Sequence, residues 1–255
     1  MVYFLYIFYI LLGISPSIIW LLFYLRKDYY PEPNKMVIKV FLWGIVSALI
    51  AAVLQISIIN IFKIKEVEIK NFIIFFLYNF FIISLTEELV KYLVIRQKVL
   101  KSPELDEPID VVLYMVIAAL GFSAIENVLF ILNQPILTSL GIAFYRFLGA
   151  TFLHTLSSGI LGYFLALSFL NIKKKNKYFL IGFFLAVFLH TIFNLCIIGF
   201  GSSILENSFT GEIIFKNVYL FCVSLISLSV LLLGSGFYLS YKIKKIKKIK
   251  SICKL

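Results

Sequence analysis

The chain has 255 residues, of which 62% are hydrophobic and 15% charged, and it carries a formal net charge of +11. Soluble domains are about half apolar, so this composition, with a mean hydropathy of +1.01, excludes an ordinary water-soluble globular protein. The apolar runs span roughly 20 residues without an alternating period, which favours transmembrane helices over barrel strands. The sequence therefore predicts an all-α, polytopic transmembrane helix bundle that forms a single integral-membrane domain over residues 1–255.

Seven apolar stretches follow one another, each long enough to cross a bilayer. They cover residues 1–25, 36–62, 71–95, 111–132, 140–170, 178–200 and 218–241. The fifth is longer than a bilayer requires, so we expect one long, tilted helix there.

The connections between these spans differ in positive charge. One alternate set of loops, together with the C-terminal tail, holds 17 of the 24 Lys and Arg residues, and the other set holds 4. The first set is 26–35, 96–110, 171–177 and 242–255, and the second is 63–70, 133–139 and 201–217. Cytoplasmic loops carry the excess of Lys and Arg, so we expect the N-terminus outside and the C-terminus in the cytoplasm. No nucleic-acid motif accompanies these cations, and we expect no nucleic-acid partner.

The basic tail, 242–255, places an isoleucine at every third position from Ile243 to Ile252 among 7 lysines. This pattern predicts a short helix on the anionic inner leaflet, where each Lys contributes about 1 kcal/mol. A disordered basic stop signal explains the same composition, because a three-residue spacing drifts around a helix of about 3.6 residues per turn. Anionic lipid is the partner expected for the tail, and both conformations stay open.

Two adjacent carboxylates, Glu87 and Glu88, interrupt the third span. Ionisable residues at membrane depth are costly and indicate a functional site. On a helix, Lys91 lies four residues after Glu87 and three after Glu88, so both carboxylates can reach its ammonium group. We therefore expect Lys91 to form a structural ion pair. The alternative is that these charges mark the wet end of the helix.

Further polar residues lie in the later spans. The two histidines of the chain, His154 and His190, both fall in apolar stretches, as does a third carboxylate, Glu126. His190 and Asn194 are four residues apart and share a helix face, so the amide can orient the imidazole or bind the same ligand. Small residues nearby let helices approach closely. These patterns predict one shared polar cavity lined by Glu87, Glu88, Glu126, His154, His190 and Asn194.

The chemistry of such a cavity points to hydrolysis by water. None of the serines in the spans has the Gly-x-Ser-x-Gly context of a nucleophile. Burial favours a neutral Glu and a neighbouring ammonium favours an ionised one, so the Glu pair could divide into acid and base. Imidazoles could stabilise an oxyanion. Alternatively, Glu88, Glu126, His154 and His190 could hold a metal ion, with zinc as the candidate, although the motif HExxH is absent.

The order of these motifs resembles the PrsW family of bacterial intramembrane proteases. The resemblance rests on Glu87-Glu88-x-x-Lys91, Gly121-Phe122-x-x-x-Glu126-Asn127, His154 in a small-residue helix, His190-x-x-x-Asn194, and Pro108-x-Asp110 before the fourth span. It covers about residues 86–194. CAAX prenyl endopeptidases and bacteriocin-processing proteases are more distantly similar. Prenyl endopeptidases have a histidine where Glu126-Asn127 stands here, which favours the PrsW family.

The resemblance implies a multi-pass protease of the bacterial plasma membrane with its catalytic core at about residues 71–200. It implies Glu87, Glu88 and His190 as catalytic residues, followed by Glu126, His154 and Asn194. The member that gives the family its name makes the first cut in a membrane-anchored anti-sigma factor during a stress response. A membrane-anchored protein of that kind is therefore the expected substrate.

Two other functional classes remain compatible with the residues alone. Charged side chains at depth could form a relay in an ion- or proton-coupled transporter or channel. That function predicts two related halves, which the sequence does not show. A catalytically silent membrane scaffold or immunity protein could also retain the same fold.

Overall fold

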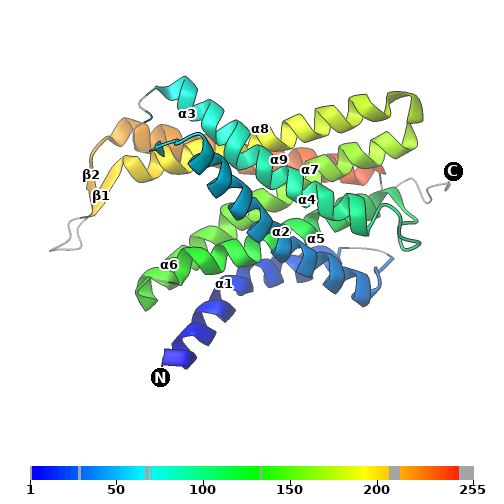
Figure 1. Ribbon diagram of the computed structural model, residues 1–255, viewed down its shortest axis with the longest axis horizontal. Coiled ribbons are helices and arrows are strands. Elements are labelled where there is room, and N and C mark those ends of the chain that lie inside the picture. The colour runs from blue at the N-terminus through cyan, green and yellow to red at the C-terminus, as the bar shows by residue number, and fades with distance from the viewer. Residues whose placement is uncertain are drawn as a thin grey trace.

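The computed structural model describes residues 2–27, 30–66, 69, 71–132, 134–206 and 213–246 (Figure 1). The long helices are α1 (Val2–Leu25), α2 (Asn34–Ile61), α4 (Leu85–Lys98), α5 (Pro108–Ile131), α7 (Ala150–Leu170), α8 (Lys175–Ser202) and α9 (Val218–Ile246). The shorter elements are α3 (Phe72–Tyr78), the π-helix η2 (Asn79–Ser84), α6 (Ile136–Leu148), the 3-10 turn η3 (Ile172–Lys174), β1 (Ile204–Glu206) and β2 (Ile213–Phe215). The two strands form an antiparallel hairpin with Leu205 opposite Ile214.

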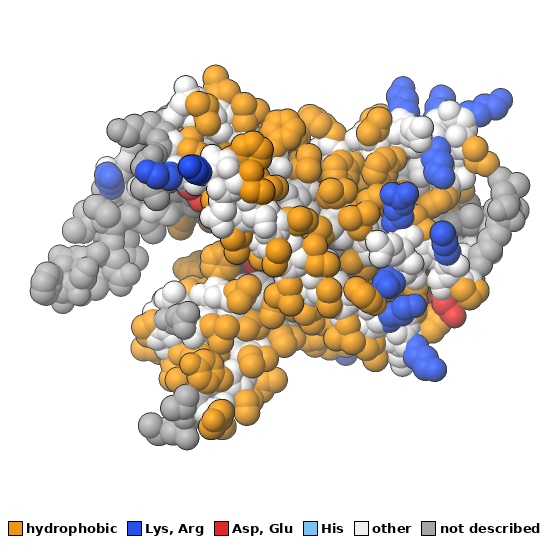
Figure 2. Space-filling view, viewed as in Figure 1, with side chains coloured by type: hydrophobic (Ala, Val, Ile, Leu, Met, Phe, Trp, Pro, Cys, Tyr) orange, Lys and Arg blue, Asp and Glu red, His pale blue; other side chains and the backbone are white. Residues whose placement is uncertain are grey.

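Seven helical stretches are long and apolar enough to cross a membrane, which confirms the predicted polytopic helix bundle. In Figure 1 the start of α1 and the end of α9 lie at opposite ends of the bundle, as an odd number of crossings requires. Figure 2 shows Lys and Arg side chains gathered at the right-hand end, where the α4–α5 and α7–α8 connections lie. Which end faces the cytoplasm stays a prediction from the charge distribution.

The central element of the bundle is α5. Every residue from Pro108 to Ala124 is buried, as expected for a helix that is apolar on all sides. It packs against α1, α2, α4, α6, α7 and α9. The second half of α5 carries Glu126, so the helix that organises the core also reaches the polar cluster.

Two glycines allow α2 to cross α5 with the backbones in contact. A Cβ atom on Gly121 would overlap the carbonyl oxygen of Phe41, and one on Gly44 would overlap that of Ala118. Lipid provides little hydrophobic drive for helix association, so close packing at small residues is a main source of stability. This crossing fixes the path of α2, which brings Gln55 to the polar cluster.

The fifth span is two helices, whereas the sequence predicts one tilted helix. Helix α6 ends at Leu148 and α7 begins at Ala150, with Gly149 between them at φ −103° and ψ −89°. Helix α6 packs against α1, α5 and α7. The apolar composition of a stretch indicates that it lies in the membrane, but it does not show where the helix axis changes direction.

The predicted basic tail is described only up to Ile246. Helix α9 continues through Lys242, Lys244 and Lys245. Residues 247–255 lie outside the described residues, and the contact of the tail with anionic lipid stays a prediction.

The α2–α5 contact predicts opposite effects for two glycine substitutions. Alanine is favoured over glycine in a helix by about 0.8–1.0 kcal/mol, but overpacking typically costs about 1–3 kcal/mol. We expect Gly121→Ala to lower the thermal unfolding temperature in detergent, because its Cβ meets backbone. Gly234→Ala on α9, where no described atom lies within 4 Å of the added carbon, should leave that temperature unchanged or raise it. If the two substitutions changed the unfolding temperature equally, the close backbone contact between α2 and α5 would be contradicted.

Candidate active site

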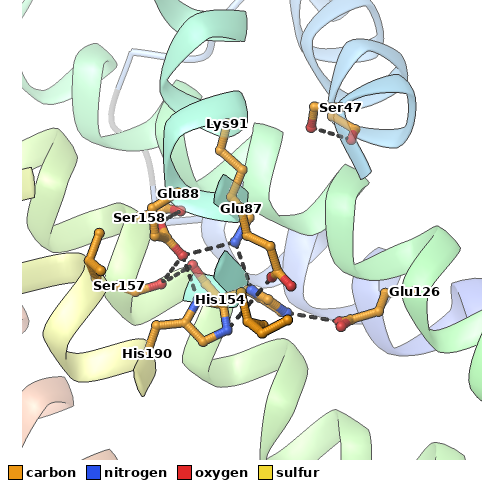
Figure 3. A network of polar contacts seen from close by, with 12 residues as sticks. Ser47, Glu87, Glu88, Lys91, Glu126, His154, Ser157, Ser158 and His190 are labelled. Carbon is orange, nitrogen blue, oxygen red and sulfur yellow. Dashed lines mark hydrogen bonds and ion pairs between the residues drawn. The ribbon is translucent and has the colours of Figure 1, made fainter. Parts of the chain in front are cut away.

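Three glutamates and both histidines of the apolar spans meet in one cluster between α4, α5, α7 and α8 (Figure 3). Helix α4 supplies Glu87 and Glu88, α5 supplies Glu126, α7 supplies His154 and α8 supplies His190. The side chain of Glu126 is 26% exposed, while the other four residues are buried. The structure therefore brings together five of the six residues predicted to line a shared cavity.

The carboxylate of Glu88 is fully buried and receives four hydrogen bonds. Its Oε1 accepts from Nζ of Lys91 at 2.9 Å, from Oγ of Ser157 at 3.0 Å and from Nδ1 of His190 at 2.9 Å. Its Oε2 accepts from Oγ of Ser158 at 3.0 Å. A buried charge is tolerated when it is paired and hydrogen-bonded in this way. Glu88 is thus placed to hold its neighbours rather than to meet a substrate.

Glu87 and His190 face each other without a hydrogen bond. Because Nδ1 of His190 donates to Glu88, the neutral imidazole presents the lone pair of Nε2. That nitrogen lies 3.7 Å from Oε2 of Glu87, a buried oxygen without a hydrogen-bond partner among the described residues. Oε1 of Glu87 accepts from Nε2 of Gln55 at 3.3 Å. Two acceptor atoms across such a gap are suited to share a cation or the protons of a water molecule.

His154 bridges Lys91 and Glu126. Its Nδ1 lies 2.8 Å from Nζ of Lys91, and its Nε2 lies 2.9 Å from Oε2 of Glu126. An ammonium group only donates and a carboxylate only accepts, so Nδ1 carries the lone pair and Nε2 the proton. The same oxygen of Glu126 accepts from Nη2 of Arg146 at 2.6 Å.

Three of these side chains fit a metal ion. One ligand atom each from Glu87, His154 and His190 lies within 4.8 Å of the other two. Three protein ligands plus water are typical of catalytic zinc sites, and an imidazole that donates its other N–H to a carboxylate is typical of metal-binding histidines. The unpartnered Oε2 of Glu87 supports this fit.

This ligand set differs from the one considered from sequence, which was Glu88, Glu126, His154 and His190. Glu88 is saturated by its four donors, and Oε2 of Glu126 already accepts two hydrogen bonds. Glu87 therefore replaces Glu88 and Glu126 as the carboxylate ligand of the candidate metal site. If a metal ion binds to Nδ1 of His154, Lys91 has to lose its contact with that nitrogen and keep only its contact with Glu88.

Asn194 does not join the cluster. It lies one turn beyond His190 on α8, is half-buried and makes no hydrogen bond within the described part of the chain. The two ring nitrogens of His190 face Glu87 and Glu88 instead. The steadying of His190 that the sequence assigned to the amide is performed by Glu88.

The structure also adds residues that the sequence argument did not place at the site. They are Gln55, Asn127, Arg146, Ser157 and Ser158. Arg146 could have been found as a charge within an apolar span, and Ser158 as a residue four positions after His154. Gln55 offered no signal, because its contact depends on how α2 crosses the bundle.

A buried set of carboxylates and imidazoles inside a bundle of membrane-spanning helices is the kind of site that an intramembrane hydrolase requires. Comparison with known proteins identifies the family. The model of the PrsW family intramembrane metalloproteases matches residues 32–227, and the chain belongs to this family. It is thus a peptide hydrolase and a multi-pass membrane protein, and its relatives are bacterial.

Several bacterial proteins named Protease PrsW are similar to the chain. That of Oceanobacillus iheyensis is 32% identical over 195 residues, covering 74% of this chain and 83% of the relative. That of Geobacillus kaustophilus is 28% identical over 183 residues, covering 71% and 76%. That of Clostridioides difficile is 27% identical over 187 residues, covering 72% and 76%. No solved structure gives a significant match.

The position of Lys91 predicts a joint loss of stability and activity when its charge is removed. Its ammonium group is fully buried between Glu88 and His154, and breaking a buried ion pair costs about 3–5 kcal/mol. We expect Lys91→Met to lower both the thermal unfolding temperature and the rate of proteolysis. Lys101→Met, at an exposed position just after the same helix, is the control and should change neither. A stable but inactive Lys91→Met would place Lys91 among the catalytic residues instead.

Proposed function

We propose that the chain hydrolyses a peptide bond of a membrane-anchored protein, within or near the membrane, with Glu87 as the residue that activates water. The observation that carries the proposal is the buried Oε2 of Glu87, which lies opposite Nε2 of His190 and has no hydrogen-bond partner in the part of the chain that the structure describes. A water molecule between these atoms can donate a hydrogen bond to each of them. Both oxygens of Glu88, by contrast, already accept hydrogen bonds from other side chains.

Glu87 would take a proton from the water as the oxygen attacks the carbonyl carbon. When the carbon–nitrogen bond breaks, the same carboxyl would return the proton to the leaving amine. His190 would orient the water through Nε2, and its own ring is fixed by the hydrogen bond from Nδ1 to Glu88. Stabilisation of the oxyanion by an imidazole, which the sequence suggested, would require His190 to carry a proton on Nε2 in addition to the one that Nδ1 donates to Glu88.

A metal ion is compatible with the same residues. Glu87, His154 and His190 would hold it, with Glu88 and Glu126 orienting the two imidazoles. When bound, such an ion would acidify water and stabilise developing negative charge on the carbonyl oxygen. The description of the family as metalloproteases supports this version, and zinc is the candidate ion.

The shape of the molecule supports a substrate embedded in lipid. Figure 2 shows a hollow between the part that contains α3 and the end of α8 and the part that contains α6. Large apolar side chains are exposed on both of these parts, among them Phe72 on α3 and Phe144 on α6. A helical segment hides its carbonyl groups in its own hydrogen bonds, so a substrate has to unwind locally before attack. An anti-sigma factor with one membrane anchor is the substrate class that we propose.

The two adjacent glutamates should respond differently to substitution by glutamine. General-base catalysis is worth about 10²–10⁴-fold, and Oε2 of Glu87 has no hydrogen bond to lose. We therefore expect Glu87→Gln to reduce cleavage of a membrane-anchored substrate by at least about 100-fold while the thermal unfolding temperature changes little. Glu88→Gln should lower both, since an amide nitrogen cannot accept the donors around Glu88. Glu104→Gln in the exposed α4–α5 connection is the control and should resemble wild type.

Wild-type cleavage by Glu87→Gln would remove the residue at the centre of this proposal. A rate loss shared equally by Glu87→Gln and Glu88→Gln, each with an unchanged unfolding temperature, would mean that the division of roles between the two is wrong.

Metal removal gives a separate test. If Glu87, His154 and His190 hold an ion, dialysis against a strong chelator should abolish cleavage, and zinc should restore it. His190→Gln should lower the amount of zinc bound per protein, whereas Glu104→Gln should leave it unchanged. Full activity of a metal-free preparation would contradict the metal-dependent version and leave water activation by Glu87 in place.

A further inference from the structure

The geometry points to Arg146 as a positioning residue that acts on His154 through Glu126. We propose that Arg146 holds the carboxylate of Glu126 against Nε2 of His154 and thereby fixes the tautomer with the lone pair on Nδ1. The inference rests on the proposed function, because a fixed lone pair matters only if Nδ1 serves the site.

Arg146 is held at several points on the last turns of α5. Its Nη2 donates to Oε2 of Glu126 at 2.6 Å, and its Nε donates to Oδ1 of Asn127 at 2.5 Å. Its guanidinium carbon also lies 4.2 Å from the ring centre of Phe130. The side chain is 12% exposed. A planar guanidinium with two directed contacts fixes its partners more rigidly than a lysine ammonium would.

The contact of Nε2 with Glu126 and the contact of Nδ1 with Lys91 together select which nitrogen of His154 carries the proton. Oε2 of Glu126 accepts from Arg146 and from Nε2 of His154 at the same time. While Arg146 holds the carboxylate in place, Nε2 has to donate, and the lone pair is left on Nδ1. If the Glu126 side chain is free to rotate away, only the contact of Nδ1 with Lys91 still favours this tautomer, and the opposite tautomer becomes accessible.

A second set of contacts reaches the helix that carries His154. Nδ2 of Asn127 donates to Oγ1 of Thr151 at 3.0 Å, and Ser123 donates to the same hydroxyl at 3.1 Å. Thr151 lies in the first turn of α7, three residues before His154. Arg146 lies on the other side of the break at Gly149, so its contact with Asn127 links the end of α6 to the start of α7.

The tautomer matters in both versions of the proposed chemistry. Nδ1 of His154 needs its lone pair to accept from Lys91, as in this structure, and equally to bind a metal ion. A proton on Nδ1 would block both contacts. Arg146 therefore supports the site without touching the substrate.

Nitrogen-15 NMR of the protein in lipid bilayers tests the inference directly, because the chain has only 2 histidines. With labelled histidine, protonated and unprotonated ring nitrogens give separate signals, and a His190→Gln sample assigns those of His154. In metal-free wild type we expect a single His154 tautomer with the proton on Nε2. Arg146→Met should show a mixture or the opposite tautomer. Arg146→Lys should retain part of the wild-type pattern.

Two further variants separate positioning from a merely structural role. Arg96→Met, in an exposed position near the end of α4, should leave the spectrum and the rate unchanged. Asn127→Ala removes the contact that links α6 to α7 but leaves Glu126, so it should lower the unfolding temperature and keep the tautomer. Arg146→Met should lower kcat by about 10–100-fold, the range for residues that orient metal-binding histidines, with little change in KM.

An unchanged His154 tautomer in Arg146→Met would overturn the inference. If that variant does not fold, the His154 tautomer is measured by nitrogen-15 NMR in Arg146→Gln and Arg146→Lys instead. A single tautomer in wild type that is lost in these variants supports the role of Arg146 even if no membrane-anchored substrate is cleaved. That combination would contradict the proposed function alone.

Discussion

The burial of the Glu88 carboxylate is the interaction on which the rest of the site depends. An isolated charge at membrane depth is expensive, and this one receives donors from Lys91 on its own helix, from Ser157 and Ser158 on α7 and from His190 on α8. Because the donors come from three helices, the same bonds that satisfy the charge also align α4, α7 and α8. The orientation of His190 is a direct consequence, since its Nδ1 is committed to Glu88.

Adjacent residues on a helix point in different directions, and this separates the two glutamates of the pair. Glu88 faces the donors of α7 and α8, while Glu87 faces Gln55 on α2 and Nε2 of His190. Both oxygens of Glu88 therefore accept hydrogen bonds, while Glu87 keeps a buried oxygen that has no hydrogen-bond partner among the described residues. A site for hydrolysis needs both carboxylates. Glu88 holds the surrounding side chains in fixed positions, and such preorganised groups allow Glu87 to act on a ligand in a low-dielectric interior.

The packing of the helices explains how the side chains around Glu87 and Glu88 are held in place in lipid. Helix α5 is buried along most of its length, and its close crossing with α2 at Gly44 and Gly121 leaves little freedom to shift. The break at Gly149 places the end of α6 next to the end of α5, where Arg146 meets Glu126. Both histidines are thus backed by a carboxylate that is itself held by a cation, Glu88 by Lys91 and Glu126 by Arg146.

The sequence by itself determined the membrane class, the seven spans, the family and most members of the polar cluster, because ionisable residues stand out in long apolar runs. It also placed Lys91 within one helix turn of both Glu87 and Glu88, and the structure pairs it with Glu88. Only the tertiary structure decided that Glu87 rather than Glu88 is open to a ligand, that Arg146 and Gln55 belong to the site, and that Asn194 does not. Helical spacing relates residues three or four positions apart. These contacts instead join residues 20 to 102 positions apart on different helices, whose crossing angles and breaks come from packing of the whole bundle.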